Sequence, residues 1–131
     1  MATEKVNLHD LKVMLPDKLL EYAEKVGVDG LLLTVPAYNK PQQEGLFQHF
    51  KAIAESTELS CVLYNVPSRT SLNMTDETTL RLAEIKNIIG VKEASSDHVQ
   101  IAKIIANTPE GFKVWSGNDF ISSSNCTIFI I

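Results

Sequence analysis

Apolar residues along the chain form four unbroken runs, and the segments between the runs have apolar residues at every third or fourth position. The runs cover residues 30–35, 61–65, 88–93 and 112–116. Unbroken apolar runs of this length are typical of strands that are buried on both faces, as in parallel sheets covered by helices. The pattern therefore predicts an alternation of strands and helices.

The segments between the runs have the spacing of amphipathic helices. Thr75 and Asp97 stand where helix N-caps are expected, and Gln100 completes a possible capping box with Asp97. The residues expected to face the core are Leu19, Leu20, Ala23 and Val26 in the first helix, Leu46, Phe50, Ile53 and Ala54 in the second, Leu80, Leu82 and Ala83 in the third, and Val99, Ala102 and Ile105 in the fourth.

The predicted strands begin near residues 30, 61, 89 and 112, at intervals of 31, 28 and 23 residues. These intervals match the length of a βα unit, and right-handed crossovers make the sheet parallel. The fold class is therefore α/β, as one domain over residues 1–131. Both a small doubly wound sheet and part of a (β/α)8 barrel fit this pattern, whereas four strands exclude a complete barrel. The two ends, residues 1–16 and 120–131, do not follow the repeat.

Composition excludes several classes of protein. The 131 residues include 12 basic and 16 acidic side chains, a net charge of −4 without a basic cluster, so nucleic acid is not an expected partner. Neither a long apolar segment nor a signal peptide is found, so we expect no membrane attachment and a cytoplasmic location. Cys61 is expected to be a small buried hydrophobe. The three histidines and two cysteines lack metal-ligand spacing, so no metal is expected.

Function in parallel α/β sheets gathers at the carboxyl ends of the strands. Tyr64 and Lys92 lie at two such ends, and Tyr38 and Arg69 lie in the loops beyond strands. Strand alternation places Lys92 on the same face as Ile88 and Gly90. A partly buried lysine can supply an amine for attack on a carbonyl. Each residue taken alone also fits an ordinary role, such as a solvated charge or a packed aromatic ring.

Three motifs in fixed order resemble the dihydrodipicolinate synthase family, within the pyruvate-dependent class I aldolases. They are residues 36–46 (PAYNKPQQEGL), 64–70 (YNVPSRT) and 90–95 (GVKEAS). The similarity runs from about residue 19 to 119. It implies a (β/α)8 barrel of which this chain holds about four parallel βα units, corresponding to the fourth to seventh strands.

The resemblance also implies a role for each candidate residue. Lys92 matches the lysine that forms a covalent imine with pyruvate, so no separate cofactor is expected. Tyr64 matches the proton-relay tyrosine, and Tyr38 matches the tyrosine that completes the relay across a subunit interface of a homo-oligomer. Arg69 matches the arginine that holds the carboxylate of aspartate semialdehyde, and Gly117 matches a backbone position lining the pocket.

The chain departs from the family pattern in two respects. Nothing in residues 1–29 matches the Gly-Thr-Thr-Gly stretch that supplies a relay hydroxyl and binds the pyruvate carboxylate. After Asp119 the family pattern is expected to stop. We therefore read the chain as an internal segment with atypical ends, inactive by itself.

Three functional hypotheses remain open at this point. The first is the lyase that condenses pyruvate with aspartate semialdehyde in lysine (diaminopimelate) biosynthesis. The second is another pyruvate-dependent aldolase, such as N-acetylneuraminate lyase, although the Arg69 context favours the synthase. The third is a non-catalytic truncated fragment of the same family.

Overall fold

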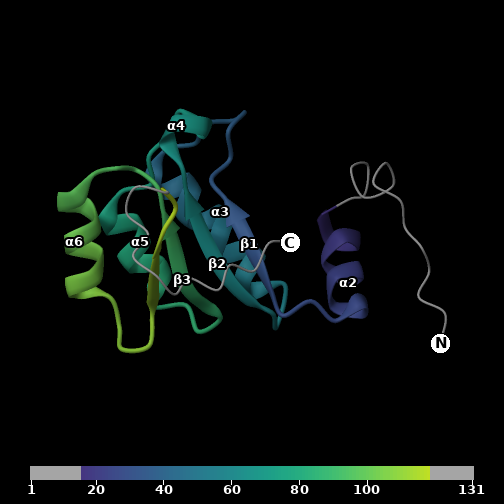
Figure 1. Cartoon of the computed structure of the whole chain (residues 1–131). Helices are drawn as coiled ribbons and strands as arrows, with labels where there is room; N and C mark the ends of the chain where they lie inside the picture. The colour runs from purple at the N-terminus through teal and green to yellow at the C-terminus, as the bar shows by residue number, and fades with distance from the viewer. Residues whose placement is uncertain (1–15, 119–131) are drawn as a thin grey trace.

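The computed structural model describes residues 16–118, which form four strands and five helices in alternation (Figure 1). All four predicted strands are confirmed. In chain order the elements are α2 (Pro16–Val26), β1 (Gly30–Thr34), α3 (Gln43–Glu55), β2 (Ser60–Asn65), α4 (Pro67–Thr70), α5 (Asp76–Ala83), β3 (Ile88–Glu93), α6 (His98–Asn107) and β4 (Lys113–Ser116).

The four strands form one sheet in the order β1-β2-β3-β4, and every neighbouring pair is parallel. This confirms the predicted parallel and sequential pairing. A doubly wound sheet reverses its strand order at a switch point, whereas a (β/α)8 barrel adds each strand beside the previous one. The observed order is therefore that of a barrel segment, and the doubly wound alternative is wrong.

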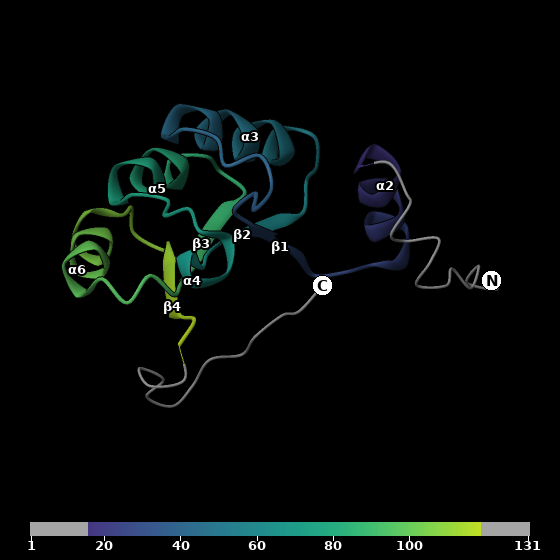
Figure 2. The same ribbon diagram turned by 90° about the horizontal axis from the view of Figure 1, so that it is seen from above.

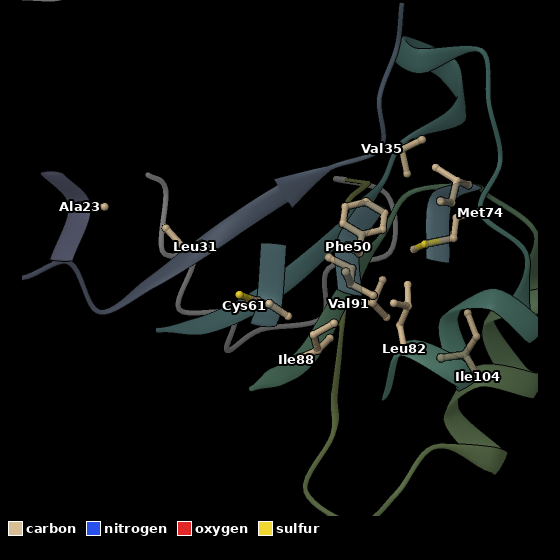
Figure 3. Close-up of a cluster of buried hydrophobic side chains, with 13 residues drawn as sticks. Ala23, Leu31, Val35, Phe50, Cys61, Met74, Leu82, Ile88, Val91 and Ile104 are labelled. Carbon is tan, nitrogen blue, oxygen red and sulfur yellow. The ribbon is translucent and has the colours of Figure 1, made fainter. Parts of the chain in front are cut away.

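One face of the sheet is covered by α3, α5 and α6, which follow the strands in an arc (Figure 2). The core lies between these helices and the strands. Phe50 of α3, Leu82 of α5 and Ile104 of α6 are fully buried and converge on Val91 of β3 (Figure 3). Cys61 is a member of this cluster, as expected, and its burial raises the pKa of the thiol to about 11. The sulfur therefore acts as a buried apolar group.

The predicted alternation in β3 is wrong at its first residue. Ile88 pairs with Cys61 and Gly90 pairs with Val62, so the register shifts between the two pairs. Ile88 is consequently buried in the helix-covered core and does not share the face of Lys92 and Gly90. A local irregularity of this kind inserts one extra residue and changes the side to which the preceding side chains point. The pairing from Gly90 onward follows the predicted alternation.

The apolar stripe predicted for α6 is also wrong. Val99 and Ile105 are 67% and 61% exposed, whereas Ile104 and the polar Gln100 are buried. The Gln100 side chain turns inward because it finds hydrogen-bond partners beneath the helix, which rotates the apolar residues expected there toward the surface. In α2, Ala23 is buried as predicted, but Leu19 and Val26 are exposed.

Both predicted N-caps are confirmed. The Thr75 side chain accepts a hydrogen bond from the Thr78 amide. The Asp97 side chain accepts hydrogen bonds from the amides of Val99 and Gln100, both 3.0 Å long. The reciprocal bond of a capping box is not formed, because the Gln100 side chain is used elsewhere.

Replacing Asp97 by Ala should therefore lower the free energy of unfolding by about 1 kcal/mol, the usual value of an N-cap. Urea denaturation of the 131-residue chain measures this change. The matched control is Asp29→Ala, at an exposed loop aspartate, which should stay within about 0.5 kcal/mol of the unchanged chain. Equal effects of the two substitutions would contradict a specific capping role for Asp97.

Candidate active site

Tyr64 and Lys92 lie side by side at the carboxyl ends of β2 and β3. The two residues are direct partners in the parallel register, so their side chains leave the same face of the sheet. The Lys92 Nζ lies 4.6 Å from the centroid of the Tyr64 ring, within the range of a cation–π contact. The prediction that these two residues share one side of the sheet is confirmed.

An indole ring packs on Gly90, two residues before Lys92 in β3. Trp115 pairs with Lys92 in the register, and its ring lies over Gly90 so closely that a Cβ at Gly90 would collide with it. Lys92 is half-buried, and it forms no ion pair with any residue between 16 and 118. The amine therefore lies beside the Tyr64 ring without a carboxylate partner among the described residues.

Gly117 lies directly against the Tyr64 ring. A Cβ built at Gly117 would approach the Tyr64 Cε2 atom to 3.3 Å and the Ala94 Cβ to 2.6 Å, so a side chain there would displace its neighbours. The Gly117 amide donates to the Glu93 carbonyl at 2.8 Å, which extends the strand pairing beyond β4. The structure thus brings Gly117, Tyr64 and Lys92 together.

Arg69 lies in the single-turn helix α4, directly after β2. Pro67 opens this turn, the Arg69 amide donates to the Val66 carbonyl at 2.9 Å, and Ser71 ends the turn with a left-handed φ of 57°. The guanidinium is exposed and forms no ion pair with a described residue. Its planar fork of donors suits a carboxylate ligand.

Tyr38 is 97% exposed in the loop after β1, and no described contact joins it to Tyr64 or Lys92. Residues 16–118 therefore leave nearly the whole ring uncovered. The structure brings together three of the five predicted site residues, and it holds Arg69 in α4 and Tyr38 in the loop after β1.

Sequence reasoning missed a polar cluster on the opposite, helix-covered face. Asn65 and Glu93 directly follow Tyr64 and Lys92, and both are buried, at 0% and 2% exposure. The Asn65 side chain donates to the Glu93 carboxylate, and the Gln100 side chain donates to the same carboxylate. Strand alternation, which places Glu93 on the face opposite Lys92, is the signal in the sequence for this buried carboxylate.

No group of three or more potential metal-ligating side chains occurs within residues 16–118. None of the helices in this part of the chain is long and apolar enough to cross a membrane.

The sequential parallel sheet, with a lysine and a tyrosine at its carboxyl edge, defines a segment of a (β/α)8-barrel enzyme. The model of the dihydrodipicolinate synthetase family matches residues 17–128. This chain belongs to that family. The matched range starts near the expected residue 19 and runs past the expected limit at 119, into residues outside the described part of the structure.

Curated relatives agree with this assignment. The chain is 63% identical over 97 residues to 4-hydroxy-tetrahydrodipicolinate synthase of Dehalococcoides mccartyi (strain ATCC BAA-2266 / KCTC 15142 / 195), covering 74% of this chain and 33% of the relative. It is 55% identical over 106 residues to the synthase of Bacillus subtilis (strain 168), covering 80% of this chain and 37% of the relative. The chain therefore spans about a third of the length of the curated relatives it matches.

Solved structures give the same result for the fold. The dihydrodipicolinate synthase of Bacillus anthracis superposes with a TM-score of 0.76 at 48% identity, over 79% of this chain and 35% of that one. The enzyme of Thermotoga maritima gives a TM-score of 0.74 at 50% identity, over 79% of this chain and 36% of that one. The expected partial (β/α)8 barrel is thereby confirmed.

Proposed function

We propose that this chain carries the imine-forming part of a 4-hydroxy-tetrahydrodipicolinate synthase, a lyase that condenses pyruvate with aspartate semialdehyde in lysine biosynthesis. The observation that carries the proposal is the Lys92 Nζ, 4.6 Å from the Tyr64 ring at the carboxyl edge of a parallel sheet. Family membership and the printed names of the relatives support the choice of reaction.

In this proposal the lone pair of the Lys92 amine attacks the keto carbon of pyruvate, and loss of water leaves a protonated imine. The imine withdraws electrons, so a methyl proton leaves and an enamine forms. The enamine carbon then attacks the aldehyde carbon of the second substrate. Each step moves a proton, and the hydroxyl of Tyr64, whose ring lies 4.6 Å from the Lys92 Nζ, would carry it.

Arg69 and Tyr38 complete the proposal. The exposed Arg69 guanidinium, without an ion-pair partner among residues 16–118, is available for the carboxylate of aspartate semialdehyde. The exposed Tyr38 ring would complete the proton relay from a neighbouring subunit of a homo-oligomer. The cytoplasmic location expected from the sequence stays a prediction. One structural relative is described as a monomeric dihydrodipicolinate synthase variant.

Reductive trapping tests the proposed function. The purified chain is incubated with pyruvate and borohydride, and intact mass spectrometry follows the reduced adduct in native buffer and in urea. We expect one adduct per native chain, formed much faster than in urea, because only the folded chain holds Lys92 beside Tyr64. A non-catalytic fragment would give slow, multiple labelling at equal rates in both conditions.

Replacing Tyr64 by Phe should slow adduct formation by about 100-fold, since a positioned proton donor contributes at least this factor. The substitution keeps the ring next to Lys92 and removes only the hydroxyl. Time courses by intact mass give the rate. The matched control is Tyr22→Phe in α2, which should keep the rate of the unchanged chain. A Tyr64→Phe rate equal to that of the control would remove Tyr64 from the relay.

A further inference from the structure

Behind the proposed site, on the helix-covered face, the Glu93 carboxylate is buried at 2% exposure, and its donors among residues 16–118 are all uncharged. The Asn65 Nδ2 donates to both carboxylate oxygens, at 3.0 and 3.2 Å. The Ser95 amide donates to Oε1 at 2.8 Å, and the Gln100 Nε2 lies 3.4 Å from Oε2. Burying a charged or polar group is costly unless such bonds are complete, so the arrangement calls for a specific role.

The same cluster holds the segment that follows Arg69. The Asn65 side chain accepts from the Met74 amide at 3.0 Å and donates to the Asn73 side chain at 2.8 Å. Gln100 of α6 donates to the Met74 carbonyl at 3.0 Å. Two strand ends, one helix and the loop after α4 are therefore joined through these side chains.

The two strand residues of the cluster each adjoin a proposed site residue on the open face. Glu93 directly follows Lys92, and Asn65 directly follows Tyr64. Successive strand residues are joined by a peptide bond and their side chains point to opposite faces, so a shift of one residue moves the side chain of the other. The Asn65–Glu93 bonds thus fix the separation of the two strand ends that carry Tyr64 and Lys92.

We propose that Glu93 is a positioning residue, which holds the Lys92 amine against Tyr64 and, through Asn65, anchors the loop after Arg69. This inference rests on the proposed function for its catalytic meaning, but its geometric content is independent of pyruvate. A carboxylate is required because the side-chain oxygens of Glu93 meet donors at every bond formed within residues 16–118. The isosteric Glu93→Gln places an NH2 group against a donor and forces the cluster to rearrange.

The test compares the 131-residue chain carrying Glu93→Gln with Glu84→Gln, which removes an exposed carboxylate next to α5. Circular dichroism and thermal unfolding establish that both variants fold. Two-dimensional NMR then follows the upfield shift that the Tyr64 ring imposes on the Lys92 side-chain protons. Pyruvate trapping by borohydride follows the amine itself. We expect Glu93→Gln to lose the shift and to slow trapping at least about tenfold, as small misplacements do, while Glu84→Gln changes neither.

A folded Glu93→Gln that keeps both the shift and the trapping rate would overturn the positioning role, and a loss of stability alone would show a structural role only. If Glu93→Gln does not fold, Asn73→Ala takes its place, because it removes a half-exposed member of the same cluster. An unchanged Lys92 shift in folded Asn73→Ala then overturns the proposal. If the unchanged chain itself is not labelled by pyruvate, the proposed function fails, and the NMR shift alone decides the positioning role.

Discussion

Replacing Lys92 by Met should abolish the pyruvate adduct of the native chain. Met keeps the length and apolar stem of the lysine but has no amine, so no imine can form at this position. The chain is incubated with pyruvate and borohydride, and intact mass spectrometry measures the adduct. Because Lys92 is the amine that the structure places beside Tyr64, the predicted loss is complete at times when the unchanged chain carries one adduct.

The matched control is Lys86→Met, which removes an exposed lysine from the turn before β3. This variant should form the adduct at the rate of the unchanged chain. A Lys92→Met chain that still gained one adduct at an undiminished rate would show that another amine reacts.

The second large effect concerns turnover. In a coupled assay with pyruvate and aspartate semialdehyde, the 131-residue chain should be slower than an intact relative by more than about 1,000-fold. Loss of positioning by about 1 Å alone costs on the order of 100-fold, and a missing relay hydroxyl costs roughly 100- to 10,000-fold. The described sheet has four strands, which do not close a barrel, and residues 1–29 have no match to the family's pyruvate-carboxylate stretch.

Trapping and turnover are expected to differ because they need different parts of the site. Imine formation needs an amine and a nearby proton donor, and in the proposed mechanism these are Lys92 and Tyr64. The full cycle also needs bound carboxylates and a relay from other segments. Turnover within about tenfold of the Bacillus subtilis synthase, lost in Lys92→Ala, would contradict this account.

The sequence predicted the strands well because each is an apolar run bounded by polar residues or proline. Pro36 and Pro67 follow β1 and β2, and the run at 88–93 is β3 itself. It did not decide between a doubly wound sheet and a barrel segment, because strand order depends on which edges pair. The family resemblance favoured the barrel, and the β1-β2-β3-β4 order established it.

Helix faces and buried polar groups were harder to predict. The apolar residues of α6 suggested that Val99 and Ile105 face inward, but the bonds of Gln100 to Met74 and Asn73 determine the orientation of the helix. Periodicity counts apolar residues and cannot register a polar side chain that finds partners in the core. The role of Glu93 was missed for the same reason, since its partners come from three separate segments.

The central claim is that Lys92 is the residue that forms the imine, and peptide mass mapping of the borohydride-reduced chain tests it most directly. After reduction in the presence of pyruvate, the chain is digested and every lysine-containing peptide is quantified. The account predicts that the reduced adduct lies on Lys92, with Lys86 and Lys113 unmodified. An adduct found on other lysines, with Lys92 unmodified, would contradict it.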